Sequence, residues 1–362
     1  MFGERVYNFA AGPSVLPEPV LLKAQKELLN YGGSGMSVME MSHRSKAYQE
    51  IFDSTKQKLR RALDVPDTHE ILFLQGGATL QFASVPMNLM ALTGKADYAV
   101  TGNFSGIAAR EAEKYGSVHI CADTSDCGHS RIPTQAELTF SEGSGYFHYC
   151  ENNTIYGTEW HYVPETELVR VCDMSSNILS KPVTVSDYGL IYAGAQKNMA
   201  PAGLTVVIVD KALAGHALPV TPKLMDYKTL IEKDSMLNTP PCWCIYVLGL
   251  TLDWLEQQGG VTAMAQLRKA RSELVYDALD NSTLFRPHAE TGSRSAMNVC
   301  FSTGSAELDA EFVSSAAEKG LVNLKGHRLT GGIRASMYNA MPYEAAEALV
   351  KLIREFEVKH HV

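Results

Sequence analysis

Apolar residues are arranged along this chain in two alternating ways, as longer segments with helical spacing and as short continuous runs. Residues 17–30 (PEPVLLKAQKELLN) carry apolar side chains at helical spacing after a proline, and YGGSG follows them, so a helix is predicted there. A second helix is predicted over 45–63, and a third from the Gly pair at 76–77 through 88. Short apolar runs predict strands over 71–74, 97–101, 118–121, 145–150, 168–172, 189–192 and 204–209.

Strands that are apolar throughout and alternate with helices indicate a mostly parallel sheet with helices on both faces, which is the α/β class. Residues 211–242 are rich in Pro, Lys and Thr and show little periodicity, so we expect a long loop across a surface. A long helical pattern then runs from 245 to 278. The last part predicts strands around SAMNVCFST and GGIRASMYN and helices over 307–319 and 343–358, which together form an α+β unit.

The length of 362 residues favours two domains. We predict a large α/β domain over 16–255 and a small α+β domain over 256–362. The N-terminal segment, residues 1–15, is expected to pack near the active site or the small domain.

Composition and charge narrow the possible partners. The net charge of −8 and the pI near 5.8 disfavour nucleic acid. The chain has no run of about 18 apolar residues and no signal-like N-terminus, so a soluble, cytoplasmic protein is expected. Its seven cysteines suggest no disulfide framework. Cys242 and Cys244 lack a second pair at zinc spacing, so we predict no metal site and expect two buried thiols beside Trp243.

Two ionisable residues each end an apolar strand. LVRVCD leads into Asp173, and 24 residues later (197 − 173) GLIYAGAQK leads into Lys197. A buried carboxylate needs a cation or several donors, for which a protonated pyridine nitrogen would serve, and a desolvated lysine suits Schiff-base chemistry. Taken singly, Asp173 could be a helix N-cap and Lys197 a solvated loop charge. Taken together they favour a site, because open α/β sheets bind ligands at the carboxyl ends of their strands.

The turn Gly76-Gly77-Ala78-Thr79 precedes a predicted helix and offers backbone N–H groups to a phosphate ester. It could equally be a plain strand-to-helix turn or part of a dinucleotide site. The patterns G-x-G-x-x-G and G-x-x-x-x-G-K-[ST] are both absent, which weakens the nucleotide alternatives.

Several longer stretches resemble one family over essentially the whole chain. They are NFAAGPSVLPEPVL, MSVMEMSHRS, FLQGGATLQFASVPMNL, DMSSNILSKPVTVSDYGLIYAGAQKNMAPAGLTVVIV, MLNTPP and KGHRLTGGIRASMYNAMP. The chain is similar to the phosphoserine aminotransferases, which are fold-type I pyridoxal 5′-phosphate enzymes of the class V aminotransferase group. The resemblance implies a large, mostly parallel sheet of the seven-stranded type and a smaller C-terminal domain.

The resemblance also implies the cofactor contacts. Lys197 would form the Schiff base and Asp173 would hold the pyridine nitrogen. Thr154 would bond the phenolic oxygen, and Phe104 would stack on the ring. The phosphate would be held by Gln196, Ala78 and Thr79, and by Asn238 and Thr239 of the neighbouring subunit, which implies a homodimer.

The implied substrates are L-glutamate and 3-phosphohydroxypyruvate, a phosphorylated 2-oxo acid, and the products are 2-oxoglutarate and O-phospho-L-serine. Arg334 would clamp the α-carboxylate, and two His-Arg pairs would surround the distal carboxylate or phosphate. These pairs could instead be surface charges. They are His43 with Arg44 and His327 with Arg328.

Two positions depart from many relatives, which have Trp at Phe104 and, in some cases, Gly-Arg at Ala78-Thr79. A smaller ring still stacks, while loss of the arginine transfers phosphate binding to backbone N–H groups and the Thr79 hydroxyl.

Rival interpretations are an alanine–glyoxylate aminotransferase, a cysteine desulfurase, or a non-catalytic protein that binds a phosphorylated ligand at Gly76-Gly77. The resemblance leaves open a second, phosphorylated hydroxythreonine substrate in vitamin B6 synthesis.

Overall fold

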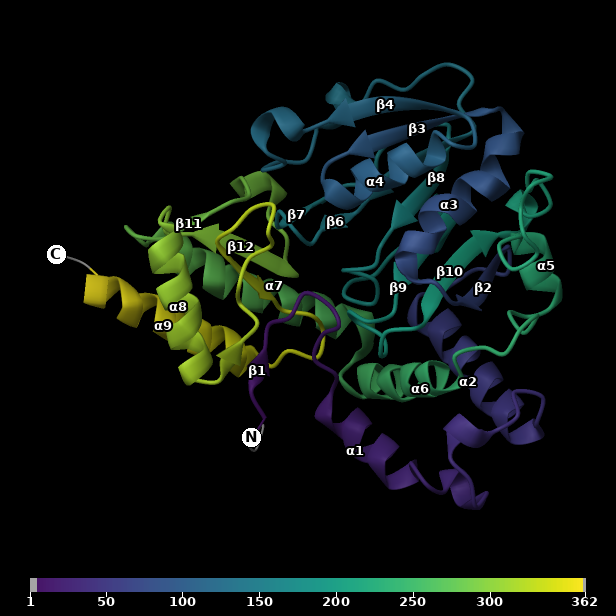
Figure 1. Cartoon of the computed structure of the whole chain (residues 1–362), viewed down its shortest axis with the longest axis horizontal. Helices are drawn as coiled ribbons and strands as arrows, with labels where there is room; N and C mark the ends of the chain where they lie inside the picture. Colours follow the sequence, from purple (N-terminus) through teal and green to yellow (C-terminus); the bar gives the residue numbers. More distant parts are fainter. Residues whose placement is uncertain (1–4, 361–362) are drawn as a thin grey trace.

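A seven-stranded sheet forms the larger part of the molecule (Figure 1) in a computed structural model that describes residues 5–360. Strand β10 runs antiparallel to both of its neighbours, and the other adjacent pairs are parallel. The predicted α/β class with a mostly parallel sheet is confirmed. In spatial order the strands are β2 (His69–Leu74), β10 (Thr205–Asp210), β9 (Leu190–Gly194), β8 (Val169–Asp173), β5 (Tyr146–Cys150), β3 (Lys95–Val100) and β4 (Ser117–Asp123).

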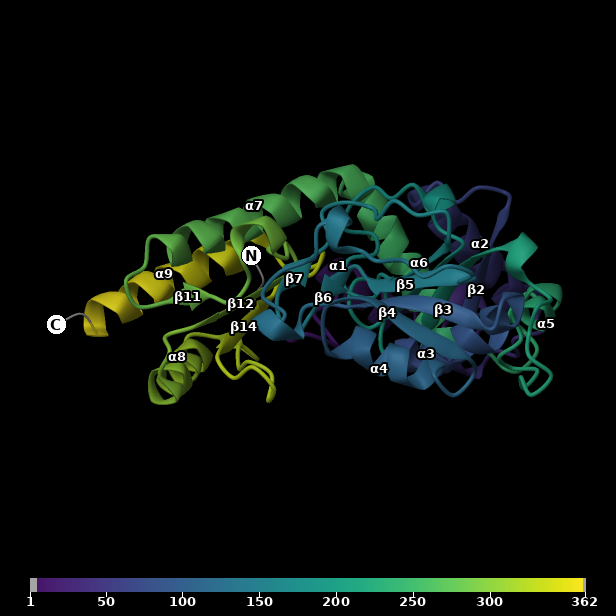
Figure 2. The same cartoon turned by 90° about the horizontal axis from the view of Figure 1, so that it is seen from above.

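Helices cover both faces of this sheet, as strands apolar on both sides require (Figure 2). Helices α2 (Lys46–Ala62) and α6 (Cys242–Gln257) pack on one face, with α1 (Glu18–Glu27) against α6. Helices α3 (Gly77–Leu89) and α4 (Asn103–Ala112) pack on the other. Among residues 5–360, no helix combines the length and the apolar character that a bilayer crossing needs.

The segment 211–242 is only partly the loop that its sequence predicts. It contains helix α5 (Tyr227–Glu232), which begins at the Asp226 cap and buries Tyr227 and Leu230 against the sheet layer. Six residues are too few for a helical period to show in the sequence. Cys242 and Cys244, at the start of α6, are half-buried thiols rather than fully buried ones.

A second, three-stranded antiparallel sheet lies beside the first. Its strands are β11 (Arg286–Pro287), β12 (Asn298–Ser302) and β14 (Ile333–Ser336), and it packs with helices α7 (Gly260–Asp280), α8 (Ala306–Glu318) and α9 (Tyr343–His360). Near the N-terminus, β1 (Tyr7–Asn8) pairs with β13 (Leu321–Val322), and Phe9 and Val15 join the core of this unit. The boundary between two domains near residue 255 stays a prediction.

Candidate active site

The carboxyl ends of the central strands open into a cavity of about 290 Å³. Strand β8 ends at Asp173, and the turn after β9 carries Gln196 and Lys197. The two strands are adjacent and parallel, so residues 24 positions apart in the chain face the same space. Of the predicted site residues, the cavity is lined by Ala78, Thr79, Phe104, Thr154, Asp173, Gln196, Lys197, His327 and Arg334.

Lys197 is held in place by hydrogen bonds to its own carbonyl, to the preceding carbonyl and to its side-chain amine. Its Nζ donates a hydrogen bond to Thr154 Oγ1 at 3.0 Å and lies 5.9 Å from the centre of the Phe104 ring. Ser14 fixes the backbone, because its N–H donates to the carbonyl of Gln196 at 3.0 Å and its hydroxyl donates to that of Lys197. The amine is therefore presented to the cavity and not to open solvent.

Asp173 is a buried carboxyl group in the wall of the cavity, with only 5% of its surface exposed. Burial raises the pKa of Asp173, while the Lys197 charge and donors on Ser175 act to lower it. The Ser175 N–H donates to Oδ1 at 2.9 Å. In the described part of the chain no salt bridge reaches this carboxylate, so it can still accept a cationic partner.

These features fit pyridoxal phosphate. The carboxylate of Asp173, which has no ion-pair partner in the described residues, suits a protonated ring nitrogen, and the Lys197 amine suits an aldehyde in the same cavity. At the cavity wall, α3 begins with the turn that was predicted to bind phosphate. Gly76 there has φ +92°, and an added Cβ would lie 2.4 Å from Leu80 Cδ2, so the tight turn requires glycine.

The cationic wall of the cavity comes from the second sheet. Arg334 lies on β14, and its Nη1 donates to the Thr154 carbonyl at 3.5 Å. His327 lies in the preceding loop, where the Gly326 N–H donates to the Gly332 carbonyl at 2.9 Å. Partial burial and the nearby charges of Arg334 and Arg328 lower the pKa of His327. This wall is suited to anionic groups of a substrate.

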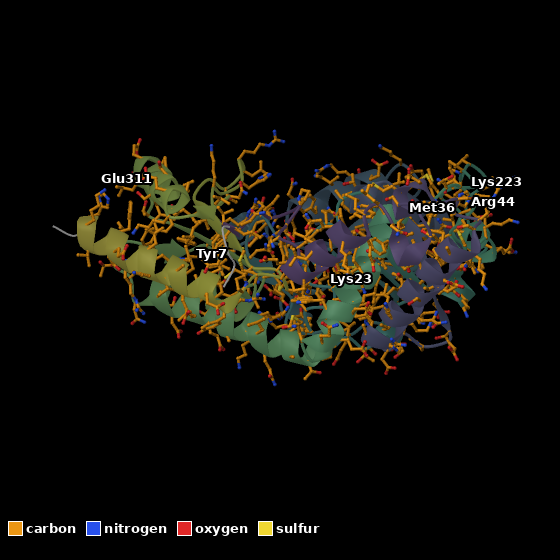
Figure 3. The ribbon with its side chains drawn as sticks, turned by 90° about the horizontal axis from the view of Figure 1, so that it is seen from below. Tyr7, Lys23, Met36, Arg44, Lys223 and Glu311 are labelled. Atoms are coloured by element: carbon orange, nitrogen blue, oxygen red, sulfur yellow. The ribbon has the colours of Figure 1, made fainter. Side chains whose placement is uncertain are left out.

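The remaining predicted residues do not line the cavity of their own chain. Arg44 is exposed and lies at the end of the molecule opposite Glu311 (Figure 3), and the half-buried His43 precedes it. Arg328 is exposed beside His327. Asn238 and Thr239 are exposed near the β2–α3 turn, where Asn238 Nδ2 donates to Gln75 Oε1 at 2.8 Å and Gln75 Nε2 donates to the Thr239 carbonyl at 3.2 Å.

Several cavity residues were not predicted. Cys150, Asn152 and Ser176 line the cavity, and the Ser176 hydroxyl lies 3.2 Å from Thr154 Oγ1 and 2.9 Å from Asn152 Nδ2. Ser176 lies three residues after Asp173 in DMSSN, so its position just after a strand end was an available signal. Asn152 had no such signal, because it depends on the fold of a short hairpin.

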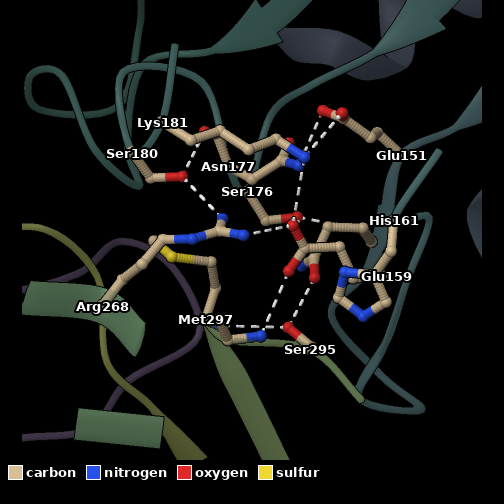
Figure 4. Close-up of polar contacts among 12 residues, drawn as sticks. Glu151, Glu159, His161, Ser176, Asn177, Ser180, Lys181, Arg268, Ser295 and Met297 are labelled. Atoms are coloured by element: carbon tan, nitrogen blue, oxygen red, sulfur yellow. Dashed lines mark hydrogen bonds and ion pairs between the residues drawn. The ribbon is translucent and has the colours of Figure 1, made fainter. Parts of the chain in front are cut away.

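That hairpin, β6 (Asn152–Asn153) and β7 (Thr158–Glu159), carries Thr154 and is anchored by a buried charge cluster (Figure 4). Fully buried Glu159 accepts from Arg268 of α7 at 2.7 Å and from Lys181 at 3.3 Å. Its second oxygen accepts from the Ala296 N–H at 3.1 Å. Lys181 also pairs with Glu151 at 3.0 Å. The cluster joins the hairpin to the helix and strand of the neighbouring unit.

Replacing Glu159 by glutamine is expected to lower the free energy of unfolding by about 3 kcal/mol, since breaking a buried ion pair leaves uncompensated charges behind. Burial acts to raise the pKa of Glu159, yet the charges of Arg268 and Lys181 outweigh it, so this pKa lies below its usual value. The stabilisation is therefore present at neutral pH and is lost as the pH falls through this depressed pKa.

Denaturant titration at pH 7 and at acid pH measures this difference. Glu273→Gln on α7 is the matched control, because its pair with Lys269 at 3.6 Å is exposed and should contribute less than about 0.5 kcal/mol. Equal, small losses for both variants would contradict an anchoring role for Glu159.

Comparison with known proteins decides the family. Residues 6–349 match the family described as Aminotransferase class-V. The chain belongs to this family. It is 50% identical over 358 residues to a phosphoserine aminotransferase from Bacillus cereus, and 48% identical to one from Pseudomonas aeruginosa, with 99% of each chain covered. Within the class-V aminotransferases it is thus a member of the phosphoserine aminotransferases, which confirms the resemblance seen in the sequence.

Solved structures agree with this assignment. The phosphoserine aminotransferase from Bacillus circulans subsp. alkalophilus superposes with a TM-score of 0.97 at 40% identity, covering 99% of this chain and 100% of that one. The pyridoxal-phosphate-bound enzyme from Trichomonas vaginalis gives 0.93 at 37% identity, with 97% and 100% covered. A Nostoc alanine–glyoxylate aminotransferase gives 0.78 at only 15% identity, which shows a shared fold alone. The chain is therefore a fold-type I, pyridoxal-phosphate-dependent aminotransferase.

Proposed function

We propose that this aminotransferase moves an amino group reversibly between L-glutamate and 3-phosphohydroxypyruvate, giving 2-oxoglutarate and O-phospho-L-serine for serine biosynthesis. One observation carries the assignment of the chemistry. The Lys197 amine and the buried Asp173 carboxylate line one cavity, and Arg334 closes the same cavity. The reaction itself is supported by full-length relatives that carry the name phosphoserine aminotransferase.

In this proposal each residue has a defined task. When bound, pyridoxal phosphate draws electrons away from the substrate Cα. Lys197 would hold the cofactor aldehyde and, once displaced by the substrate amine, would take the proton from the substrate Cα and deliver it to the cofactor carbon that had borne the aldehyde. Thr154, which accepts a hydrogen bond from Nζ at 3.0 Å, keeps that amine aimed into the cavity. Asp173 keeps the proton on the ring nitrogen.

The anionic groups of cofactor and substrate are bound at two walls. Gln196, Thr79 and the N-terminus of α3, where Ala78 contributes its backbone, would hold the cofactor phosphate. Phe104 would stack on the ring. Arg334 would bind the substrate α-carboxylate, and His327 and Arg328 would face its distal carboxylate or phosphate.

We further propose that the active form is a homodimer, in which a second copy supplies residues to each cavity. Arg44, His43, Asn238 and Thr239 do not line the cavity of their own chain. Exposed apolar side chains lie next to Asn238. Leu80 and Leu224 line a second cavity together with Asn238, while Met36, Met39, Leu80, Val220 and Leu224 are 42%, 58%, 37%, 71% and 52% exposed.

We place the enzyme in the cytoplasm, because all seven cysteines are free thiols.

A half-reaction panel tests the substrate assignment. Loss of the Schiff-base absorbance is followed after adding glutamate, phosphoserine, serine or alanine to the holoenzyme. Glutamate and phosphoserine should react at least about 100-fold faster than serine and alanine, because a site built to pair with a distal anion rejects analogues that lack it. Equal responses to serine and phosphoserine would defeat the assignment.

A further inference from the structure

A line of buried polar side chains extends behind Asp173, away from the cavity. It crosses three neighbouring strands, with Asp173 on β8, Tyr192 on β9 and His148 on β5. Asp173 and Tyr192 are register partners in the sheet, and so are Asp173 and Cys150, two residues beyond His148. The exposed fractions of Asp173, Tyr192 and His148 are 5%, 0% and 2%. Asp173 faces the cavity, whereas Tyr192 and His148 are almost fully shielded from solvent.

The contacts of Tyr192 make it a bridge. Its hydroxyl lies 2.9 Å from His148 Nε2, and as the register partner of Asp173 on the adjacent strand Tyr192 lies beside that carboxyl group and acts to lower its pKa. The His148 ring is stacked between two tyrosine rings, with centroid distances of 4.7 Å to Tyr98 and 5.9 Å to Tyr192. The other ring nitrogen, Nδ1, is buried without a hydrogen-bond partner in the described structure.

Burial decides the charges along this line. It lowers the pKa of His148 to about 3, so the imidazole is neutral, and it raises the pKa of Tyr192, so the phenol keeps its proton. A neutral imidazole carries one proton, on either nitrogen. With the proton on Nδ1, a buried donor would have no acceptor, and the phenol proton would be directed to Nε2 and away from the carboxylate.

In the other tautomer, with the proton on Nε2, the donors of His148 and Tyr192 both point along the line toward Asp173. His148 Nε2–H donates to the Tyr192 oxygen, and the Tyr192 O–H is then free for Asp173. We propose that Tyr192 and His148 are positioning residues that hold Asp173 as an oriented, hydrogen-bonded anion ready to receive the protonated ring nitrogen of the cofactor. The inference rests on the role proposed above for Asp173. It adds two residues that contact neither cofactor nor substrate.

A fixed partner for Asp173 is important because the charge of Lys197, which also stabilises the carboxylate, does not stay in place during the proposed reaction. Lys197 lowers the pKa of Asp173, yet its amine is the group that the proposed reaction engages and releases. The Tyr192 and His148 donors lie on strands of the sheet and stay in place throughout. A fixed donor keeps a buried carboxylate charged at lower cost than a moving one.

Tyr192→Phe tests the proposal by comparing two cofactors. The full-length protein is stripped of cofactor and titrated with pyridoxal phosphate or with its deaza analogue, in which C–H replaces the ring nitrogen. Tyr192→Phe should weaken binding of pyridoxal phosphate about tenfold, the effect of one hydrogen bond to a charged group. Binding of the deaza analogue, which offers no charge to Asp173, should change by less than about twofold. His148→Phe should weaken pyridoxal phosphate alone, by less than Tyr192→Phe does.

Tyr146→Phe is the matched control. Tyr146 is equally buried in the same aromatic layer, but its hydroxyl pairs with that of Tyr98 at 2.7 Å and not with His148. It should leave both affinities unchanged. If Tyr192→Phe weakens both cofactors equally, or weakens neither, the proposal is overturned. Asp173→Asn separates this failure from that of the proposed function, because an Asp173→Asn protein that still prefers pyridoxal phosphate to the deaza analogue as strongly as the native protein does would refute the role of Asp173 itself.

Discussion

Lys197→Ala is expected to abolish turnover, with a fall in kcat of about 10⁴-fold or more, because in the proposed function one amine serves both as the covalent anchor and as the proton carrier. The variant should bind pyridoxal phosphate without the Schiff-base absorbance of the native enzyme. Steady-state assays and absorbance spectra measure both effects. Lys269→Ala on the exposed face of α7 is the control and should behave as the native enzyme does. Near-normal turnover in Lys197→Ala would refute the assignment.

The same variant tests whether the site is shared between subunits. Lys197→Ala and Arg44→Ala homodimers should each be inactive, or nearly so. Mixing equal amounts and allowing subunits to exchange should restore about one quarter of native activity, because half of the dimers are hybrids and each hybrid has one complete site. If Arg44 acted within its own chain, no hybrid would hold a complete site and no activity would return.

Asp173→Asn is expected to lower kcat by about 10³-fold, the effect of removing a preorganised charge from an active site. An amide cannot hold the proton on the ring nitrogen as a carboxylate does. The assay is again the half-reaction with glutamate, in which Lys197 remains able to form the Schiff base. A variant that keeps more than about one tenth of native activity would contradict the role of Asp173.

The same substitution should leave the cofactor-free protein as stable as the native chain, or more stable. Burial raises the pKa of Asp173 above its value in the unfolded chain, so the folded state binds the carboxyl proton more tightly than the unfolded state does. The protein therefore loses stability as the pH rises from the unfolded pKa through the folded pKa of this group. At neutral pH the charge opposes folding, and asparagine removes it. Thermal unfolding without cofactor measures this. A large loss of stability would mean that the carboxylate is mainly structural.

The sequence was sufficient to predict the main strands, and it pointed to two residues that the structure places in one cavity. Continuous apolar runs predicted the strands of the large sheet, because a strand buried on both faces has no polar positions. Asp173 and Lys197 could be proposed because Asp173 ends one such strand and Lys197 follows the end of another, and sites form at the carboxyl ends of strands in a parallel sheet. The charge of each in its local sequence context was enough to suggest the chemistry.

Other features depend on contacts between residues distant in the chain. Arg334 reaches Thr154 across 180 positions, and Glu159 meets Arg268 across 109. The line from Asp173 through Tyr192 to His148 requires the order of three strands in the sheet, β5, β8 and β9. Local pattern carries no information on strand order or on which distant surfaces meet.

The sequence by itself therefore predicted the fold class, the approximate positions of the strands and the pair of residues proposed to react, because each is encoded within a few neighbouring residues. Only the tertiary structure decided which cations face that pair, which residues support it from behind, and which predicted side chains lie outside the cavity of their own chain. Arg44 illustrates the difference, since its sequence motif is specific but its position is exposed and remote from the cavity. Burial and proximity are properties of packing, and packing is settled by the whole chain.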